Sequence, residues 1–348
     1  MKIGLQYFGI AGRGSSVKSL LEYTVLAEEC GLDFVCFPER HFGGPGGVSP
    51  DPLLLAAIAL AETRSIEVRT GSLLLPLHEP MYVAERIAIL RARFGSRFGV
   101  VLGSGWNRRD FAPKLQAYDS RRESFWAGVD RLRSLVDGDE VMVPDIGGIR
   151  IETLAEAETG PSWCAVACSV SSDTAARAAS LGMAIHTHME RIAVDALRQR
   201  IETYYSAFQS SKSLLVGRGV TVMLHAMAAG GTGDIRREAT DVIASYLRET
   251  LGLELISANS GGHLSAGAKT DPALVQRRKE QLARYGAQRI VSETGLIGTH
   301  AEIRRRIDGM AVAGATEIAA LIDFDPNTTR VKNTILRLGS VRSDLKLI

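Results

Sequence analysis

Glu39, Arg40 and His41 are the most chemically capable residues that directly follow an apolar run of this chain, Phe34-Val35-Cys36. A histidine has an ordinary pKa of about 6.5, so it can give or take a proton at neutral pH, and a neighbouring carboxylate can fix its tautomer. We therefore predict that His41 is a catalytic acid or base and that Glu39 is its catalytic partner. A salt-bridged loop anchor is the alternative that this segment leaves open.

Small residues mark the next two strand ends. Gly71 and Ser72 lie in one apolar segment, and Gly103 and Ser104 end the following one, just before Trp106. A glycine inside a strand often allows a ligand or another backbone to approach closely. The pattern favours a planar ring system over these small residues, with Trp106 as a wall. Relief of crowding between strands is the alternative.

Three hydroxyl side chains gather where a helix is expected to begin. Ser171, Ser172 and Thr174 follow the apolar run from Trp163 to Cys168. The first amides of a helix have no partner within the helix, so they attract a phosphate dianion. An ordinary helix cap needs only one such residue, so three hydroxyls favour a phosphate site, while plain capping stays open.

The other histidines and the cysteines give weaker signals. His186 and His188 are spaced like a pair of metal ligands, but no third ligand follows at a suitable spacing, so no metal site is predicted. His225 ends the seventh apolar run and lines either a ligand site or the core. The four cysteines lack a CxxC spacing and are expected to be reduced structural thiols.

Chemistry at several strand ends requires a fold that brings those ends together. Apolar runs alternate with amphipathic stretches, the order typical of βαβ units. Strands are expected at 2–8, 33–37, 66–75, 97–103, 163–168, 183–187, 218–225 and 316–323. Helices are expected at 16–30, 50–62, 80–91, 120–136, 172–181, 191–208, 235–250, 301–313 and 327–338. The sequence therefore predicts an α/β fold, a (β/α)8 TIM barrel, as a single domain over residues 1–340, because a parallel barrel gathers the carboxyl ends of its strands at one mouth.

Two stretches exceed the minimal repeat. Residues 137–162 contain Gly147-Gly148 and the alternating run Ile149-Arg150-Ile151, which predicts a hairpin insertion before the fifth strand. Residues 251–299 contain a second amphipathic run and are expected to form a long excursion over the carboxyl-terminal mouth.

Composition excludes several classes of partner. Lysine plus arginine (41) nearly balances aspartate plus glutamate (39), so the surface lacks the strong charge that binds nucleic acid or anionic lipid. No run of about 18 apolar residues and no signal-like amino terminus occur, so no membrane contact is expected and the protein is predicted to be cytoplasmic.

Taken in order, these segments resemble the bacterial luciferase-like family of flavin-dependent monooxygenases, and more narrowly its subgroup found with natural-product biosynthesis enzymes. The resemblance covers almost the whole chain and rests on Gly4 to Phe8, Glu39 to Phe42, Gly71 to Pro80, Gly103 to Trp106, Tyr118 with Arg121 to Glu123, Thr221 to His225, and Ile318 to Phe324. The chain departs from the family pattern at 91–97, which lacks the usual aspartate, and at 169–172, where bulkier residues replace a glycine-bearing phosphate loop.

The resemblance implies a barrel that holds reduced FMN at its mouth and uses O2 to oxygenate a small or carrier-bound biosynthetic intermediate. In that family His41 matches a histidine at the catalytic mouth, which Glu39 would orient. The implied flavin-binding residues are Gly71 and Ser72 beside the isoalloxazine or ribityl chain, Ser104 and Trp106 beside the ring, Tyr118 near the ribityl chain or phosphate, and Ser171, Ser172 and Thr174 at the phosphate. The expected substrate-binding residues are Phe42, Leu77, His78 and His225.

Partners follow from the same resemblance. A homo-oligomer is implied, and a separate flavin reductase is expected because no pyridine-nucleotide motif such as GxGxxG follows the first strand. Two alternatives stay open. One is a hydride-transfer oxidoreductase that uses the deazaflavin F420, and the other is a degenerate, non-catalytic barrel that acts as a partner protein.

Overall fold

The computed structural model describes residues 1–9, 16–43, 47–151, 162–168, 171–189, 194–229, 234–259 and 272–346. Within these ranges, eight parallel strands close into a barrel, each paired with the next and the last paired with the first. In barrel order they are β1 (Lys2–Gln6), β2 (Phe34–Phe37), β3 (Glu67–Thr70), β5 (Phe98–Gly103), β8 (Ser162–Ala167), β9 (Ala184–His188), β11 (Val220–Ala228) and β13 (Glu317–Leu321). The predicted (β/α)8 architecture is confirmed.

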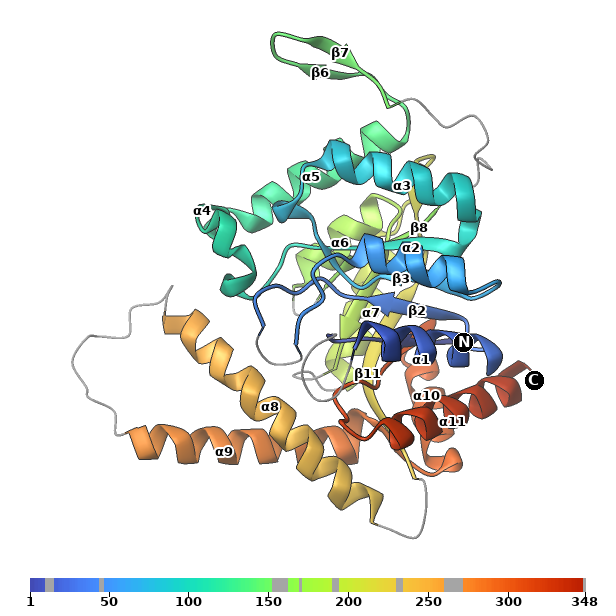
Figure 1. Ribbon diagram of the computed structural model, residues 1–348, viewed down its shortest axis with the longest axis vertical. Helices are drawn as coiled ribbons and strands as arrows, with labels where there is room; N and C mark the ends of the chain where they lie inside the picture. Colours follow the sequence, from blue (N-terminus) through green and yellow to red (C-terminus); the bar gives the residue numbers. More distant parts are fainter. Residues whose placement is uncertain are drawn as a thin grey trace.

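Helices surround these strands (Figure 1). They are α1 (Val17–Glu29), α2 (Pro52–Glu62), α3 (Pro80–Phe94), α5 (Arg121–Val136), α6 (Ser172–Ser180), α7 (Val194–Ala207), α10 (His300–Val312) and α11 (Thr328–Lys346), with the short α4 (Gln116–Asp119) before α5. Local chemistry sets their starts. For example, α2 begins at Pro52 with the Asp51 carboxylate accepting hydrogen bonds from the amides of Leu53 and Leu54. None of the helices in the described ranges is long and apolar enough to cross a bilayer.

Side chains alternate between two environments along each barrel strand. In β1, Ile3 and Leu5 join the large apolar core together with Leu20 of α1, whereas Gly4 faces the barrel interior, where a Cβ would collide with Phe34. A strand has a side-chain period of two residues, so burial of the outer face against helices also decides which residues point inward. The interior side chains at the carboxyl ends are therefore those available for a site.

Two strand boundaries differ from the sequence-based expectation. The run expected as one strand at 66–75 is divided into β3 and the short β4 (Leu73–Leu74), with a cis peptide bond between Gly71 and Ser72. The seventh strand continues to Ala228 because β12 (Leu296–Gly298), a strand that the sequence pattern did not indicate, pairs with its last residues.

The insertion before the fifth barrel strand contains a two-stranded hairpin. β6 (Val141–Val143) and β7 (Gly147–Ile149) pair antiparallel and project from the top of the view in Figure 1. The rest of the expected insertion, 152–161, lies outside the described residues.

The region after β11 is more helical than expected. α8 runs unbroken over Ile235–Asn259, and α9 (Pro272–Arg289) continues into a π-helical turn at Ile290–Thr294. The helix expected at 235–250 therefore continues to Asn259, and the excursion of residues 251–299 over the mouth stays a prediction. Residues 260–271 lie outside the described ranges.

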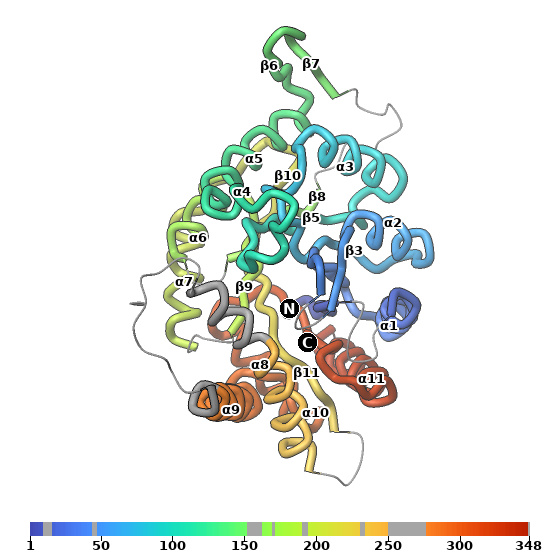
Figure 2. Tube along the Cα trace, turned by 60° about the vertical axis from the view of Figure 1, so that its left-hand side comes forward, coloured from blue at the N-terminus to red at the C-terminus, as the bar shows by residue number. Residues whose placement is uncertain are grey.

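α8 and α9 cover the carboxyl ends of two barrel strands. Ile243 and Tyr246 of α8 pack against Met227 of β11, Leu321 of β13 and Phe324. Figure 2 shows α8 beside β11, with α9 on its outer side. We call this group the roof cluster, and its buried members are Met227, Ala239, Ile243, Ala244, Tyr246, Ala287, Ile290, Val291, Ile297, Leu321 and Phe324.

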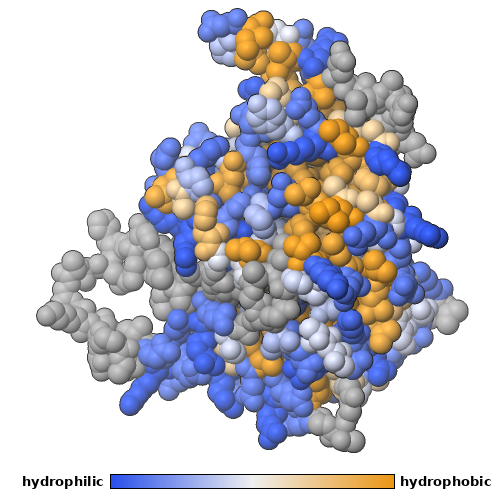
Figure 3. Space-filling model, in the orientation of Figure 1, coloured by the Kyte–Doolittle hydropathy of each residue, from blue (hydrophilic) through white to orange (hydrophobic). Residues whose placement is uncertain are grey.

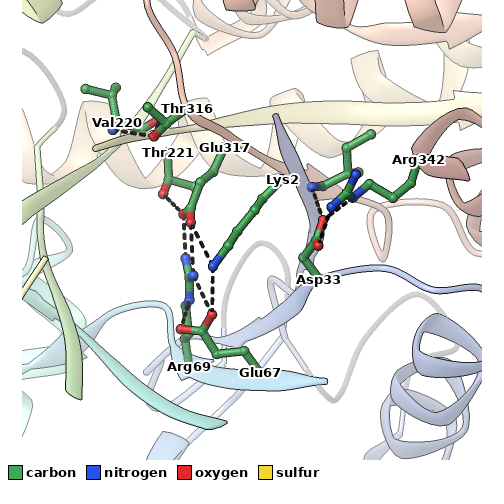
Figure 4. Close-up of polar contacts among 10 residues, drawn as sticks. Lys2, Asp33, Glu67, Arg69, Val220, Thr221, Thr316, Glu317 and Arg342 are labelled. Carbon is green, nitrogen blue, oxygen red and sulfur yellow. Dashed lines mark hydrogen bonds and ion pairs between the residues drawn. The ribbon is translucent and has the colours of Figure 1, made fainter. Parts of the chain in front are cut away.

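A buried guanidinium crosses the barrel interior near its amino-terminal end. Arg69 of β3 donates to Glu67 at 2.7 and 2.8 Å and to Glu317 of β13 at 2.6 and 3.1 Å. The hydroxyl of Thr221 in β11 donates to Glu317 at 2.6 Å, and Nζ of Lys2 in β1 lies 3.5 Å from Glu67 (Figure 4). Strands β1, β3, β11 and β13 are thus tied together through charged groups.

The charges of this group stabilise one another. Burial alone would lower the pKa of Arg69, but Glu67 and Glu317 outweigh it and raise that pKa. Burial alone would raise the pKa of Glu317, but Arg69 outweighs it and lowers that pKa. The rings of Phe34 and Trp163 lie over the guanidinium, with centroids 4.1 and 3.5 Å from its carbon. Removal of Arg69 would leave the carboxylates of Glu67 and Glu317 with only the half-exposed Lys2 as a countercharge.

We expect Arg69→Met to lower the free energy of unfolding by about 3–5 kcal/mol, because one partner of a buried ion pair is removed. Lys2→Met is the matched control, because Lys2 is half exposed and contacts the same carboxylates at 3.5 and 3.8 Å. Its loss should stay below about 1 kcal/mol. Urea denaturation of both variants measures the difference, and equal losses would show that burial of the guanidinium has no special weight.

Candidate active site at the carboxyl end of the barrel

Glu39, just after β2, receives hydrogen bonds from two histidines. Nε2 of His41 lies 2.8 Å from Oε1 of Glu39, and Nε2 of His78 lies 2.8 and 3.0 Å from its two oxygens. The backbone amide of Leu74 donates to Oε2 at 2.7 Å. His78 follows the short 3-10 helix Leu75–Leu77, so two strand-end loops meet at one carboxylate that is only 4% exposed.

The electrostatics of this group follow from the shared carboxylate. Burial alone would raise the pKa of Glu39, but the hydrogen bonds from His41 and His78 outweigh it, so that pKa lies below its ordinary value. The hydrogen bond to Glu39 raises the pKa of His41, although burial opposes the shift. The Asp110 carboxylate accepts the backbone N–H of His41 at 3.0 Å and fixes the loop that carries the ring. Glu39 is therefore an anion that holds His41 in place and favours its protonation.

Aromatic rings line the neighbouring part of the mouth. The guanidinium carbon of Arg40 lies 4.2 Å from the ring centroid of Phe8 and 5.4 Å from that of Trp106. Phe42 is 55% exposed, has a positive φ of 58°, and lies 5.7 Å from the ring of His41. These residues come from the ends of β1, β2 and β5, so the structure brings the expected wall residues Trp106 and Phe42 to the same edge as His41.

The glycines at the third and fourth strand ends are required by their protein neighbours. A Cβ on Gly103 would lie 2.4 Å from Oγ of Ser72, and a Cβ on Gly71 would lie 2.6 Å from Cβ of Cys36. Relief of crowding is therefore a sufficient reason for both glycines, and contact of Gly71 with a flavin stays a prediction. Ser72 and Ser104 are half-buried, and their flavin contacts stay a prediction.

Tyr118 braces the loop after β5. Its hydroxyl donates to the carbonyl of Trp106 at 2.9 Å, and its ring lies 3.9 Å from the guanidinium carbon of Arg121. Arg121 also donates to the carbonyls of Gly105 at 3.0 Å and of Tyr118 at 2.7 Å. The structure thus shows Tyr118 and Arg121 shaping the segment that carries Trp106, while a contact of Tyr118 with the ribityl chain or phosphate stays a prediction.

The three hydroxyls at the start of α6 include an ordinary helix cap. Oγ of Ser171 accepts the amide of Thr174 at 3.3 Å, and the Sγ of Cys168 donates to the carbonyl of Ser171 at 3.2 Å. Ser171 and Ser172 are exposed and Thr174 is half-buried. Ser171 is therefore an ordinary helix cap, and phosphate binding at this helix start stays a prediction.

His225 and Leu77 are the remaining expected substrate-binding residues. His225 is 3% exposed, and its ring contacts Tyr246 at 5.5 Å and Phe324 at 5.1 Å in the roof cluster. Leu77 is half-buried beside His78. His225 therefore lies within the aromatic packing under α8, and its contact with substrate stays a prediction.

Within the described ranges, some buried polar atoms at or near the carboxyl ends of the strands have no hydrogen-bond partner. They are Oε1 of Gln6, Nδ1 of His188 and Oδ1 of Asp323. Nδ1 of His186, which lies in register with Thr221 deeper in the barrel, likewise has none within these ranges. Burial lowers the pKa of His186 to about 4, so its ring is neutral. Buried polar atoms are rarely left without partners, and a polar ligand is one way to satisfy them. Among the described residues, no three histidine, cysteine, aspartate or glutamate side chains are grouped as metal ligands.

Asp323 is the clearest residue that the sequence analysis missed. Its Oδ2 accepts the amides of Phe8 at 2.7 Å and Gly9 at 3.0 Å, and Oδ1 has no partner in the part of the chain that the structure describes. Burial raises its pKa to about 6, against the opposing effect of these amides and of Arg40. The residue follows β13 directly, so the rule that polar residues after barrel strands form the site would have identified it.

Comparisons with known proteins agree with the barrel fold. A family model described as luciferase-like monooxygenase matches residues 6–317. The monooxygenase RslO1 from Streptomyces bottropensis is 19% identical, with a TM-score of 0.76 over 99% of this chain and 100% of that one. An F420-dependent secondary alcohol dehydrogenase, solved with an F420-acetone adduct, is 16% identical, with a TM-score of 0.72 over 97% and 98%. The oxygenating constituent of 3,6-diketocamphane monooxygenase from Pseudomonas putida, solved with FMN, is 15% identical, with a TM-score of 0.67 over 97% and 96%.

Curated relatives match over shorter stretches. Identities of 27% over 198 residues and 32% over 128 residues cover 52% and 34% of two of those relatives. The chain thus spans about half the length of the curated relatives it matches, or less. Fold is shared at these distances, whereas activity depends on the residues at the mouth.

We expect Glu39→Gln to destabilise the protein most between pH 4.5 and 6.5, the ordinary pKa values of glutamate and histidine. Because the pKa of His41 is raised, this group contributes fully to the free energy of unfolding below pH 6.5, and the contribution is lost as pH rises through the raised pKa. Because the pKa of Glu39 is lowered, the contribution of Glu39 is complete above pH 4.5. Urea denaturation at about pH 5.5 and about pH 9 measures the difference.

Glu302→Gln serves as the matched control for this titration. Glu302 caps α10 and pairs with Arg236, and these contacts hold its pKa at about 2, so its loss should be the same at both pH values. A Glu39→Gln loss that is likewise independent of pH would refute the charged pairing of Glu39 with the histidines.

Proposed function

The chain belongs to the luciferase-like monooxygenase family, and we propose that it is a two-component, FMN-dependent monooxygenase. In this proposal it uses reduced FMN and O2 to oxygenate a small or carrier-bound biosynthetic intermediate. The observation that carries the proposal is the hydrogen-bonded group of Glu39, His41 and His78, which lies at the same end of the barrel as the unpartnered polar atoms.

The unpartnered atoms fit the chemistry of a flavin ring. Gln6 Oε1 and Asp323 Oδ1 can accept hydrogen bonds. The edge of an isoalloxazine carries N–H donors, so these two acceptors are complementary to it in kind. When bound, reduced flavin supplies the electrons that activate O2. In this proposal Ser171, Ser172 and Thr174 hold the phosphate.

Exclusion of water is the first task of the protein in this proposal. A site closed to water prevents side reactions and strengthens the electrostatic interactions within it. The roof cluster provides apolar cover over β11 and β13. Trp106, Phe42 and Leu77 stand around the group of Glu39 and would complete the apolar wall toward a substrate.

The second task is to hold a proton at a defined atom. A carboxylate only accepts hydrogen bonds, so Nε2 of His41 carries the hydrogen that binds Glu39, and Nδ1 is the acceptor in the neutral ring. In the proposed function Nδ1 takes up or releases the proton of the reaction. General acid or base catalysis of this kind typically contributes about 10²–10⁴ in rate.

F420-dependent hydride transfer is the second candidate function. It is favoured by the structural similarity to an F420-dependent alcohol dehydrogenase, which has a higher TM-score (0.72) than the FMN-bound monooxygenase constituent (0.67). The same mouth and the same histidine would serve a hydride transfer, so the cofactor distinguishes the two functions.

We expect reduced FMN to bind more tightly than reduced F420 in anaerobic absorbance titrations of the purified protein. His41→Ala should leave FMN binding within about threefold and lower the rate of substrate oxygenation by about 10²–10⁴, because only proton transfer is removed. Preference for F420 would favour the second candidate. Absence of binding by either cofactor would reject both and favour a non-catalytic barrel.

A second copy of the chain is the proposed partner for the outer face of α2 and α3. Leu54 of α2 and Tyr82 and Ile89 of α3 are 58%, 57% and 58% exposed. Apolar side chains gather over these helices in the right half of Figure 3. Large exposed apolar patches mark interaction sites, and a self-association surface is consistent with the oligomer that the family resemblance implies.

We expect the double change Leu54→Glu and Ile89→Glu to lower the molar mass in solution from that of an oligomer to that of one chain, because two charges would be buried in the interface. Light scattering after size-exclusion chromatography measures the mass. Val312→Glu is the control, because Val312 is 79% exposed on α10, and it should leave the mass unchanged. A monomeric unchanged protein would refute the proposed interface.

A further inference from the structure

His78 is tied to the proposed catalytic histidine through a third residue. We propose that His78 is a positioning residue that sets the protonation of His41 through the Glu39 carboxylate that both rings share. This inference deepens the proposed function at the same site. Its test needs neither flavin nor substrate.

The hydrogen bonds to Glu39 use its acceptor capacity completely. Oε1 receives Nε2 of His41 and Nε2 of His78, each at 2.8 Å. Oε2 receives the amide of Leu74 at 2.7 Å and Nε2 of His78 at 3.0 Å. A carboxylate has about four acceptor positions, so these contacts fill them. The two imidazoles therefore compete for the same anion.

The shared oxygen makes the two rings respond to each other. With both rings neutral, each donates Nε2–H to Glu39 and keeps Nδ1 as an acceptor. Protonation of His41 produces an imidazolium paired with the carboxylate. Because Nε2–H of His78 donates to the same oxygen, it leaves less of that negative charge to stabilise the protonated His41 ring.

Other charged groups around His41 form a constant background. Asp110 accepts the backbone N–H of His41, and Asp51 and Asp110 both favour the protonated ring. Arg40, the neighbouring cation in the chain, lies over the rings of Phe8 and Trp106. The side chains of His41 and His78 are 22% and 21% exposed, so both rings can exchange protons with solvent. A substitution at His78 leaves all of these groups in place.

The test is an NMR titration of the full chain in which the ring nitrogens of His41 report its pKa. His78→Phe should raise the pKa of His41 by about one unit, because a donor that competes for Glu39 is removed. His78→Gln keeps a neutral donor and should raise it by a smaller amount. Glu39→Gln should lower the pKa of His41, and it should abolish the effect of His78→Gln in the double variant.

His300→Gln is the matched control, because His300 forms a separate histidine–carboxylate pair with Asp344 at 2.8 Å and should leave His41 unmoved. The two His78 variants protect the test against a folding defect in one of them. An unchanged or lowered pKa of His41 in both would overturn the proposal, as would a rise that persists without Glu39. Failure of FMN to bind would count against the proposed function and would leave this titration valid.

Discussion

Burial of the Arg69 guanidinium inside the barrel is the constraint on which the rest of the structure depends. The side chain reaches from β3 to Glu317 of β13, which also binds Thr221 of β11, so strands far apart in sequence are held in one ring. Such a group needs both carboxylates and the two flanking aromatic rings, because an unpaired buried charge is costly. It fills the amino-terminal part of the interior, which leaves the carboxyl end for ligands.

At the carboxyl end, Glu39 links fewer segments, also through a buried charged group. It joins the loop after β2 to the segment after β4, and it fixes the tautomer of two histidines. Asp110 and Arg40 brace the same loop from η3 (Arg108–Lys114) and from the ring of Phe8. The candidate catalytic group is therefore held by hydrogen bonds from several elements, which gives it the rigid geometry that proton transfer requires.

Part of the carboxyl-terminal mouth is covered by helices that a simple (β/α)8 barrel lacks. α8 and α9 add a helical pair on the side of β11 and β13, and the roof cluster packs them against the strand ends. Relatives that share the fold at 15–19% identity include proteins solved with FMN and with F420. The barrel is thus common to several cofactors, and the residues at its mouth decide the chemistry.

Local patterns in the sequence determined the barrel. Alternating apolar and amphipathic runs identified the eight barrel strands, and polar residues after the second strand led to the prediction of His41 and Glu39 as site residues, because these signals depend on neighbours in the chain. Only the tertiary structure decided that His78 binds Glu39 and that β12 extends β11. It also showed that neighbouring side chains require Gly71 and Gly103, and that Asp323 keeps one unpartnered oxygen. Those contacts join residues that are distant in sequence, and their geometry exists only once the barrel has closed.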